Sequence, residues 1–132
     1  MSVAQNIRNV LITVILLTVM SCKSSRFSYK KGDQSIELLI PNNELLINTD
    51  DISTNYATLK LTNINPSKLA ITGVGVSIDK SSHNGNMYLK ILSRKDYYKG
   101  QNTYDLNVSY RTNGELFQHK FQIPIRLIKN KS

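Results

Sequence analysis

The single cysteine, Cys22, has the clearest capacity for covalent chemistry in this sequence. A cysteine thiolate is a strong nucleophile, and Cys22 has no second cysteine with which to form a disulfide. It directly follows the small residue Ser21 and an apolar run of 11 residues, Val10–Met20. A lone cysteine in an oxidising compartment is a liability unless it is consumed chemically. We therefore expect the Cys22 thiol to be consumed chemically.

The residues before Cys22 have the organisation of a secretion signal. Arg8 and the amino terminus supply a positive region, and Val10–Met20 supplies an apolar core. This core is shorter than the roughly 20 residues that a membrane-spanning helix needs. We therefore expect residues 1–21 to be a cleaved signal peptide. An uncleaved membrane helix, or a plain secretory signal followed by an incidental cysteine, are the alternatives.

The segment Val19-Met20-Ser21-Cys22 resembles the lipobox of bacterial lipoproteins. The resemblance implies cleavage between Ser21 and Cys22, a diacylglycerol on the Cys22 thiol and acylation of the new amine. Two or three acyl chains give stable anchoring where one chain would not. It also implies an outer-membrane location. Surface-exposed lipoproteins of some bacteria carry acidic residues soon after the cysteine, and none occurs here before Asp33, which favours the periplasmic side.

Other side chains that could catalyse a reaction or bind a metal are few and scattered. His83 lies in a polar Ser-Ser-His-Asn-Gly segment, and His119 lies between Phe117 and Phe121 without a carboxylate close to it in sequence. Asp50 and Asp51 lack the oxygen-rich alternating loop of a calcium site, so turn polarity explains them. We expect no catalytic residues, no metal site and no cofactor.

The segment Arg94-Lys95-Asp96-Tyr97-Tyr98-Lys99 is the strongest candidate for a binding surface. Tyrosine and arginine are frequent hot spots of protein interfaces. The predicted partner-binding residues are Arg94, Lys95, Tyr97, Tyr98 and Lys99. The same mixture could stack on sugars, as Tyr88 could. A tyrosine that merely plugs the end of the domain is the structural alternative.

These residues must be positioned by strands, because the chain after Cys22 shows period-two alternation and no helical periodicity. Polar and basic composition favours a flexible tether over residues 22–34. The pattern then predicts a domain over residues 35–132. Pro41 implies that the first two strand segments form either a bent strand or a hairpin. The predicted strands are Ser35–Ile40, Glu44–Asn48, Tyr56–Asn63, Ala70–Asp79, Met87–Leu92, Thr103–Tyr110 and Glu115–Ile128.

Seven strands of this kind predict an all-β fold, an antiparallel β-sandwich. The segment Gly100–Tyr110, followed by the hairpin signal Asn113-Gly114, resembles the last hairpin of immunoglobulin-like and fibronectin-type-III-like domains. In those folds a tyrosine near the start of the penultimate strand closes a corner through its hydroxyl, and Tyr104 is the matching position. The disulfide and tryptophan of antibody domains are absent.

Charge and location narrow the function without defining it. Removing Arg8 with the leader leaves 16 basic and 9 acidic residues, a net charge of +7. Secretion argues against a nucleic-acid partner despite this charge. We expect a non-enzymatic lipoprotein that binds a protein within an envelope assembly, such as a secretion or conjugation apparatus. An immunity or inhibitor lipoprotein that neutralises a toxic enzyme, and a surface glycan-binding module, are the alternatives.

Overall fold

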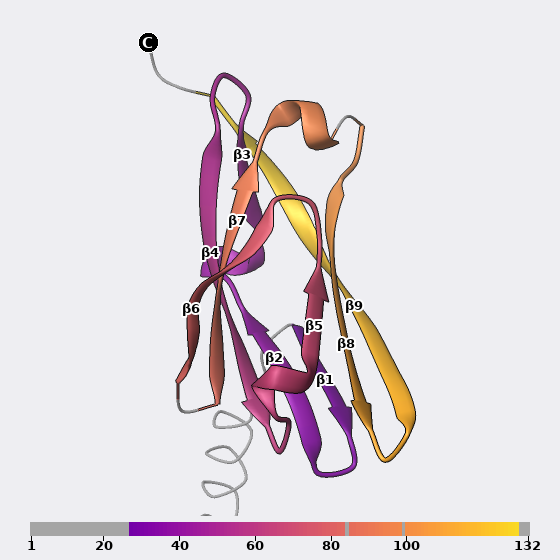
Figure 1. Cartoon of the computed structure of the whole chain (residues 1–132). Helices are drawn as coiled ribbons and strands as arrows, with labels where there is room; N and C mark the ends of the chain where they lie inside the picture. The colour runs from indigo at the N-terminus through magenta and orange to yellow at the C-terminus, as the bar shows by residue number, and fades with distance from the viewer. Residues whose placement is uncertain (1–26, 84, 99, 130–132) are drawn as a thin grey trace, which may run out of the picture.

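The chain folds into two β-sheets, seen in the computed structural model, which describes residues 27–83, 85–98 and 100–129 (Figure 1). The described residues form nine strands and three short 3-10 helices. In chain order these are β1 (Phe27–Lys31), β2 (Gln34–Leu39), η1 (Pro41–Asn43), β3 (Leu45–Asn48), β4 (Ser53–Thr62), η2 (Pro66–Lys68), β5 (Leu69–Thr72), β6 (Val76–His83), β7 (Asn86–Ser93), η3 (Lys95–Tyr98), β8 (Thr103–Thr112) and β9 (Glu115–Ile128).

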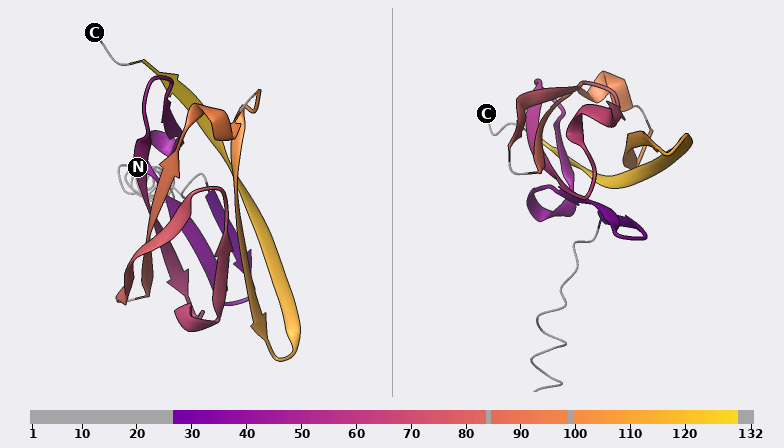
Figure 2. Two further views of the ribbon diagram at one scale, coloured as in Figure 1. Left: turned by 45° about the horizontal axis from the view of Figure 1, so that its top comes forward. Right: turned by 60° about the horizontal axis from the view of Figure 1, so that its bottom comes forward.

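The strands are divided between an antiparallel sheet and a mixed sheet. Sheet 1 has the order β1-β2-β4-β7-β6, and sheet 2 has the order β3-β9-β8-β5. Neighbours are antiparallel except β3 and β9, which pair in parallel. The end-on view in Figure 2 shows the two sheets curling around a shared interior. The all-β prediction is therefore confirmed, and a fully antiparallel arrangement is wrong.

The number of strands corrects the prediction of seven, for two physical reasons. Phe27–Lys31 forms β1 inside the segment expected to be a tether, because Phe27 and Tyr29 pack inward while Ser28 and Lys30 are exposed. The predicted strand Ala70–Asp79 is divided into β5 and β6, which belong to different sheets. The turn at Gly73–Gly75 carries the chain from one sheet to the other.

The parallel pair of strands arises from a bend at η1. Pro41 has no backbone N–H to donate, and Asn42 and Asn43 adopt left-handed φ values of 57° and 55°, which asparagine tolerates better than most residues. The chain leaves sheet 1 after β2 and continues into sheet 2 as β3 without reversing its direction. The structure thus decides between the two interpretations of Pro41 in favour of the bent strand.

The alternating side chains of both sheets meet in one hydrophobic core. Period-two patterns such as that of β4 place Ala57, Leu59 and Leu61 inside, as the sequence predicts. Eight aliphatic residues of the core have no exposed surface at all: Ile36, Leu38, Leu45, Ile47, Leu59, Ile91, Leu106 and Ile123.

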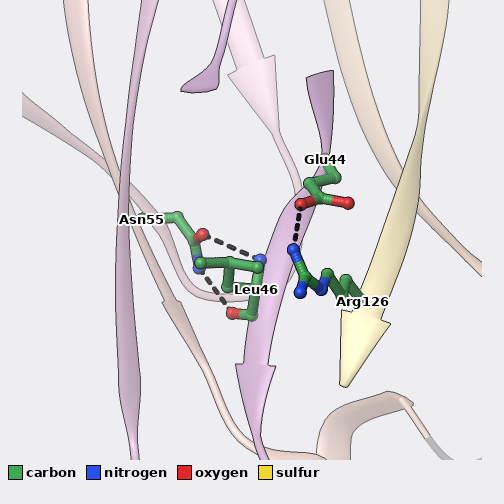
Figure 3. Close-up of polar contacts among 4 residues, drawn as sticks. All are labelled: Glu44, Leu46, Asn55 and Arg126. Carbon is green, nitrogen blue, oxygen red and sulfur yellow. Dashed lines mark hydrogen bonds and ion pairs between the residues drawn. The ribbon is translucent and has the colours of Figure 1, made fainter. Parts of the chain in front are cut away.

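Side-chain hydrogen bonds join the two sheets where β3 lies beside β4. The Asn55 amide accepts a bond from Leu46 N (2.9 Å) and donates one to Leu46 O (2.8 Å), as Figure 3 shows. Ser93, which is fully buried, also donates to Leu46 O (3.0 Å). Asn55 therefore acts toward β3 as a neighbouring strand would, because it pairs with both the N–H and the C=O of Leu46. At the start of β3, Glu44 is paired with Arg126 at 3.2 Å.

Close backbone approach explains the glycines between β5 and β6. A Cβ atom on Gly73 would overlap the hydroxyl of Tyr104, and one on Gly75 would overlap the carbonyl oxygen of Leu92. The Tyr104 side chain is 1% exposed, and its hydroxyl donates to Val74 O at 2.9 Å. The Tyr104 hydroxyl thus holds the β5–β6 turn, but its acceptor lies 30 residues upstream, whereas the corner tyrosine of immunoglobulin-like domains bonds a backbone group only a few residues upstream.

Aromatic and cation–π contacts hold β1 against β9, the second strand of the β8–β9 hairpin. The rings of Tyr29 and His119 are stacked with centroids 4.6 Å apart, and His119 meets Phe121 edge-on at 4.6 Å. The ammonium of Lys31 lies 3.5 Å from the centroid of the Phe117 ring. Partial burial among these groups lowers the pKa of His119 below its ordinary 6.5, because desolvation disfavours the charged imidazolium.

The lowered pKa of His119 makes part of the free energy of unfolding dependent on pH. We expect the contribution of His119 to be complete above pH 6.5 and to fall as the pH decreases below that value. The reason is that the unfolded chain, with the ordinary pKa, takes up the proton before the folded chain does. Urea unfolding of the wild type and of His119→Gln across this range measures the effect as a difference. Parallel pH dependence of the two proteins would contradict it.

Candidate functional site

A groove of about 810 Å³ lies on the outer face of sheet 1. Its apolar and aromatic walls include Leu39 at the end of β2, Pro41 of η1, Tyr56 of β4 and Tyr88 of β7. Leu39 is 43% exposed and Tyr56 is 56% exposed. Concave sites with aromatic walls and a few polar groups are the usual form of binding sites in proteins.

Strand register explains why these side chains share one face. Thr58 of β4 lies between Leu39 on β2 and Tyr88 on β7, and Tyr56 is the cross-strand partner of Lys90. Side chains on directly opposed residues point to the same side of a sheet. The inward neighbours Ala57 and Leu89 are paired with each other and are buried in the core.

An irregularity in β6 adds a carboxylate to the groove. Ile78 pairs with Leu89, but the next paired residue on β6 is Lys80, which lies opposite Tyr88. Asp79 is thus the extra residue of a bulge, and bulges often redirect a side chain beside a functional site. Asp79 lines the groove together with Tyr88, while Asn43 contributes an amide from η1.

The predicted partner-binding segment forms η3 and the residue before it, Arg94, at the end of the domain where β3 turns into β4. The Arg94 guanidinium lies 5.9 Å from the centroid of the Tyr97 ring and 3.9 Å from the Asp96 carboxylate. Arg94, Lys95 and Tyr97 are all exposed, Tyr97 by 47%. Lys99 and the side chain of Tyr98 lie outside the described part of the structure.

Two groups of residues that are separate in the sequence meet at this end of the domain. Asp50 and Asp51, from the turn between β3 and β4, line a pocket of about 290 Å³ with Arg94 and Lys95. Two acidic and two basic residues therefore line one pocket, which reduces the net charge of that surface. We name Arg94, Lys95 and Tyr97 the η3 surface.

The groove was not predicted, although the sequence held a signal for part of it. Tyr56 and Tyr88 occupy the outward phase of alternating strands, where a polar residue is usual on a solvated face. Leu39, Pro41 and Asp79 come from three further elements, so only the fold brings them together. The glycan-binding alternative had joined Tyr88 with Tyr97 and Tyr98, but Tyr88 lines the groove, whereas Tyr97 belongs to η3.

Within residues 27–83, 85–98 and 100–129, no group of three or more metal-ligating side chains gathers in one place. The same residues include no helix with the length and apolar character needed to cross a bilayer. Cys22 and Ser21 lie outside the described residues. Comparison of the chain with protein-family models, with curated proteins and with solved structures gives no match.

Proposed function

We propose that the protein is a lipoprotein of a bacterial outer membrane, held on the periplasmic side through acylated Cys22. Support comes from the apolar run Val10–Met20 and the lipobox-like residues that end at Cys22. Residues 1–21 would be removed as the signal peptide. The link from Cys22 to the domain is then short, because β1 begins at Phe27.

We further propose that the domain is immunoglobulin-like. In that fold one sheet has the strand order A-B-E-D and the other contains C, F and G. The order β2-β4-β7-β6 corresponds to the first, and β5, β8 and β9 correspond to the second. Strands β1 and β3 are additions to this set of seven. Tyr104 lies near the start of β8, the position of the corner tyrosine on strand F.

The function we propose is non-enzymatic binding of a protein partner within an envelope assembly. The observation that carries this proposal is the η3 surface, where a tyrosine that is 47% exposed lies beside an arginine guanidinium. Tyrosine and arginine offer apolar area and directed hydrogen bonds to a partner, and both are over-represented among interface hot spots. The position at the end of the domain leaves these side chains accessible to a large partner.

Lipid attachment is tested by metabolic labelling with a palmitate analogue. We expect label on the wild type and none on Cys22→Ala, because only the thiol at this position can accept the diacylglycerol. The mass of the amino-terminal peptide provides an independent measurement. Equal labelling of the two proteins, or a mature amino terminus that carries no fatty acid, would contradict the anchor.

The η3 surface is tested by recovery of partners from detergent-solubilised envelopes. Truncation of an interface hot spot costs about 2 kcal/mol, which corresponds to about a 30-fold loss of affinity. We therefore expect Arg94→Ala/Tyr97→Ala to lose the partner that the wild type recovers. Gln118→Ala/Lys120→Ala, on the outer face of sheet 2, is the matched control and should recover it. Equal recovery by both double variants would remove the η3 surface from the proposal.

A further inference from the structure

The covalent link to the proposed anchor is too short to hold the domain away from the membrane. Four residues lie between Cys22 and Phe27, and the five residue steps from one to the other span at most about 18 Å in a fully extended chain. Strand β4 alone has 10 residues, a length of about 33 Å. If Cys22 is acylated, as proposed above, part of the domain must therefore lie at the lipid headgroups.

The position of Phe27 indicates which part of the domain this is. Phe27 is the cross-strand partner of Leu38, the residue immediately before Leu39. Leu39 forms one wall of the groove on the outer face of sheet 1. The end of the chain that leads to the anchor thus lies one strand spacing, about 4.8 Å, from the strand that borders the groove.

The side chains on this face suit the interface of a bilayer. Leu39, Tyr56 and Leu92 are 43%, 56% and 40% exposed, and all three point outward from sheet 1. Tyrosine is enriched at membrane interfaces because its ring is apolar while its hydroxyl can remain hydrated. Aliphatic side chains exposed on the same face gain by contact with acyl chains.

Charge on the same face favours anionic lipids. Among the described side chains, Lys30, Lys60 and Lys90 point outward against two carboxylates, Glu37 and Asp79. Lysine can keep its ammonium at the headgroups while its methylene stem lies on apolar surface. The link itself contains two further cations, at positions 23 and 26, which favour the same lipids.

The outer face of sheet 2 has a different character. Its outward residues on the two central strands are mostly polar and exposed, as at Asn107, Gln118, Lys120 and Gln122, and Leu116 beside the hairpin turn is an apolar exception. Such a face is suited to water. The contrast between the two faces makes one of them a specific candidate for contact with lipid.

We infer that the outer face of sheet 1, around Leu39, Tyr56 and Tyr88, rests on an anionic phospholipid bilayer. The anchor holds the protein at the membrane, and this face determines how the domain is oriented there. In this orientation the groove opens toward lipid, while the outer face of sheet 2 is directed toward the aqueous phase.

Tryptophan reporters can test this orientation, because the natural chain contains no tryptophan. The full acylated protein carrying Tyr56→Trp, or Gln118→Trp as the matched control, is reconstituted into vesicles containing anionic phosphatidylglycerol, with or without brominated acyl chains. We expect brominated lipid to quench the emission of Tyr56→Trp. We also expect the emission maximum of Tyr56→Trp to lie at a shorter wavelength than that of Gln118→Trp. We expect no quenching of Gln118→Trp.

Flotation of the vesicles separates failure of the anchor from failure of the docking. Protein that does not float with vesicles overturns the anchor and, with it, the docking. Protein that floats with an unquenched Tyr56→Trp overturns the docking alone, and the groove would then be free for a protein partner. Equal quenching of Tyr56→Trp and Gln118→Trp would also overturn it, because the domain would have no preferred orientation.

The role of charge is tested in the Tyr56→Trp protein. Reversing two outward cations with Lys60→Glu/Lys90→Glu should reduce quenching several-fold in anionic vesicles. Lys120→Glu, on sheet 2, should leave quenching unchanged. If the double reversal had no effect, the inference of an anionic bilayer would be overturned.

Discussion

Replacing Asn55 with alanine is expected to lower the free energy of unfolding by about 2–3 kcal/mol, because it leaves a partly buried backbone donor without a partner. The Asn55 side chain is 8% exposed and bonds both Leu46 N and Leu46 O. Ser93 still donates to Leu46 O, so the main loss falls on Leu46 N–H. Urea denaturation followed by circular dichroism measures the change, which for a domain of this size can be treated as two-state.

The control for Asn55→Ala is an asparagine on the surface. Asn107 lies on the outer face of β8 and is exposed, so Asn107→Ala should change the unfolding free energy by less than about 0.5 kcal/mol. Asn55→Asp keeps an acceptor for Leu46 N–H but removes the donor to Leu46 O and buries a charge, and it should also destabilise the domain. Similar stability of Asn55→Ala and Asn107→Ala would refute the bridging role of Asn55.

A second large loss of stability is expected for Gly75→Ala, at about 2–5 kcal/mol. Gly75 has φ +76°, and a non-glycine residue in this left-handed region costs about 1–2 kcal/mol. The added Cβ would also overlap the carbonyl oxygen of Leu92. Leu92 N donates to Gly75 O at 3.0 Å, so β7 cannot move away without loss of this bond. Overpacking of this kind typically costs a further 1–3 kcal/mol, as an order-of-magnitude value.

Gly114→Ala separates the two causes of this loss. Gly114 has φ +80°, and an added Cβ would meet no atom within 4 Å. Only the conformational cost of about 1–2 kcal/mol should therefore apply to it. The difference between the two variants measures the close approach of Gly75 to Leu92. Equal destabilisation would mean that this approach contributes nothing.

Local alternation of residue types was sufficient to locate most of the strands. The pattern around Leu59 predicted β4, and that around Leu106 and Val108 predicted β8, because a half-buried strand repeats every two residues. Tyr104 could be singled out on its place before the last hairpin. In each case the signal lies within one segment of the chain, so no knowledge of distant residues was needed.

Prediction failed where a distant segment determined the structure. The chain from Ala70 to Asp79 has the composition of one strand, yet Gly73 and Gly75 allow Tyr104 and Leu92 to approach, and the segment is divided between sheets. Phe27 and Tyr29 were assigned to a tether because the segment that contains them is polar, basic and without periodicity. They form β1 because β2 offers an edge and His119 offers a ring to stack on.

The candidate sites also divide into residues that local sequence marks and residues that only contacts between distant segments bring together. Arg94, Lys95 and Tyr97 are neighbours in the chain, so their residue types alone marked them as a possible interface. The pocket that Arg94 and Lys95 line with Asp50 and Asp51, and the groove that Tyr56 shares with Asp79, depend on the pairing of strands far apart in sequence. Cys22 remains a prediction that only the covalent state of the mature protein can test.

The sequence by itself determined that the chain is all-β, where most of its strands lie and which of their residues face the core. It also supplied the grounds for expecting an acylated amino terminus. Only the tertiary structure decided that β3 runs parallel to β9, that β1 forms one edge of sheet 1 and that five elements form a groove on this sheet. Alternation is a local property of the polypeptide, whereas strand order and surface shape arise from contacts between segments that the sequence keeps apart.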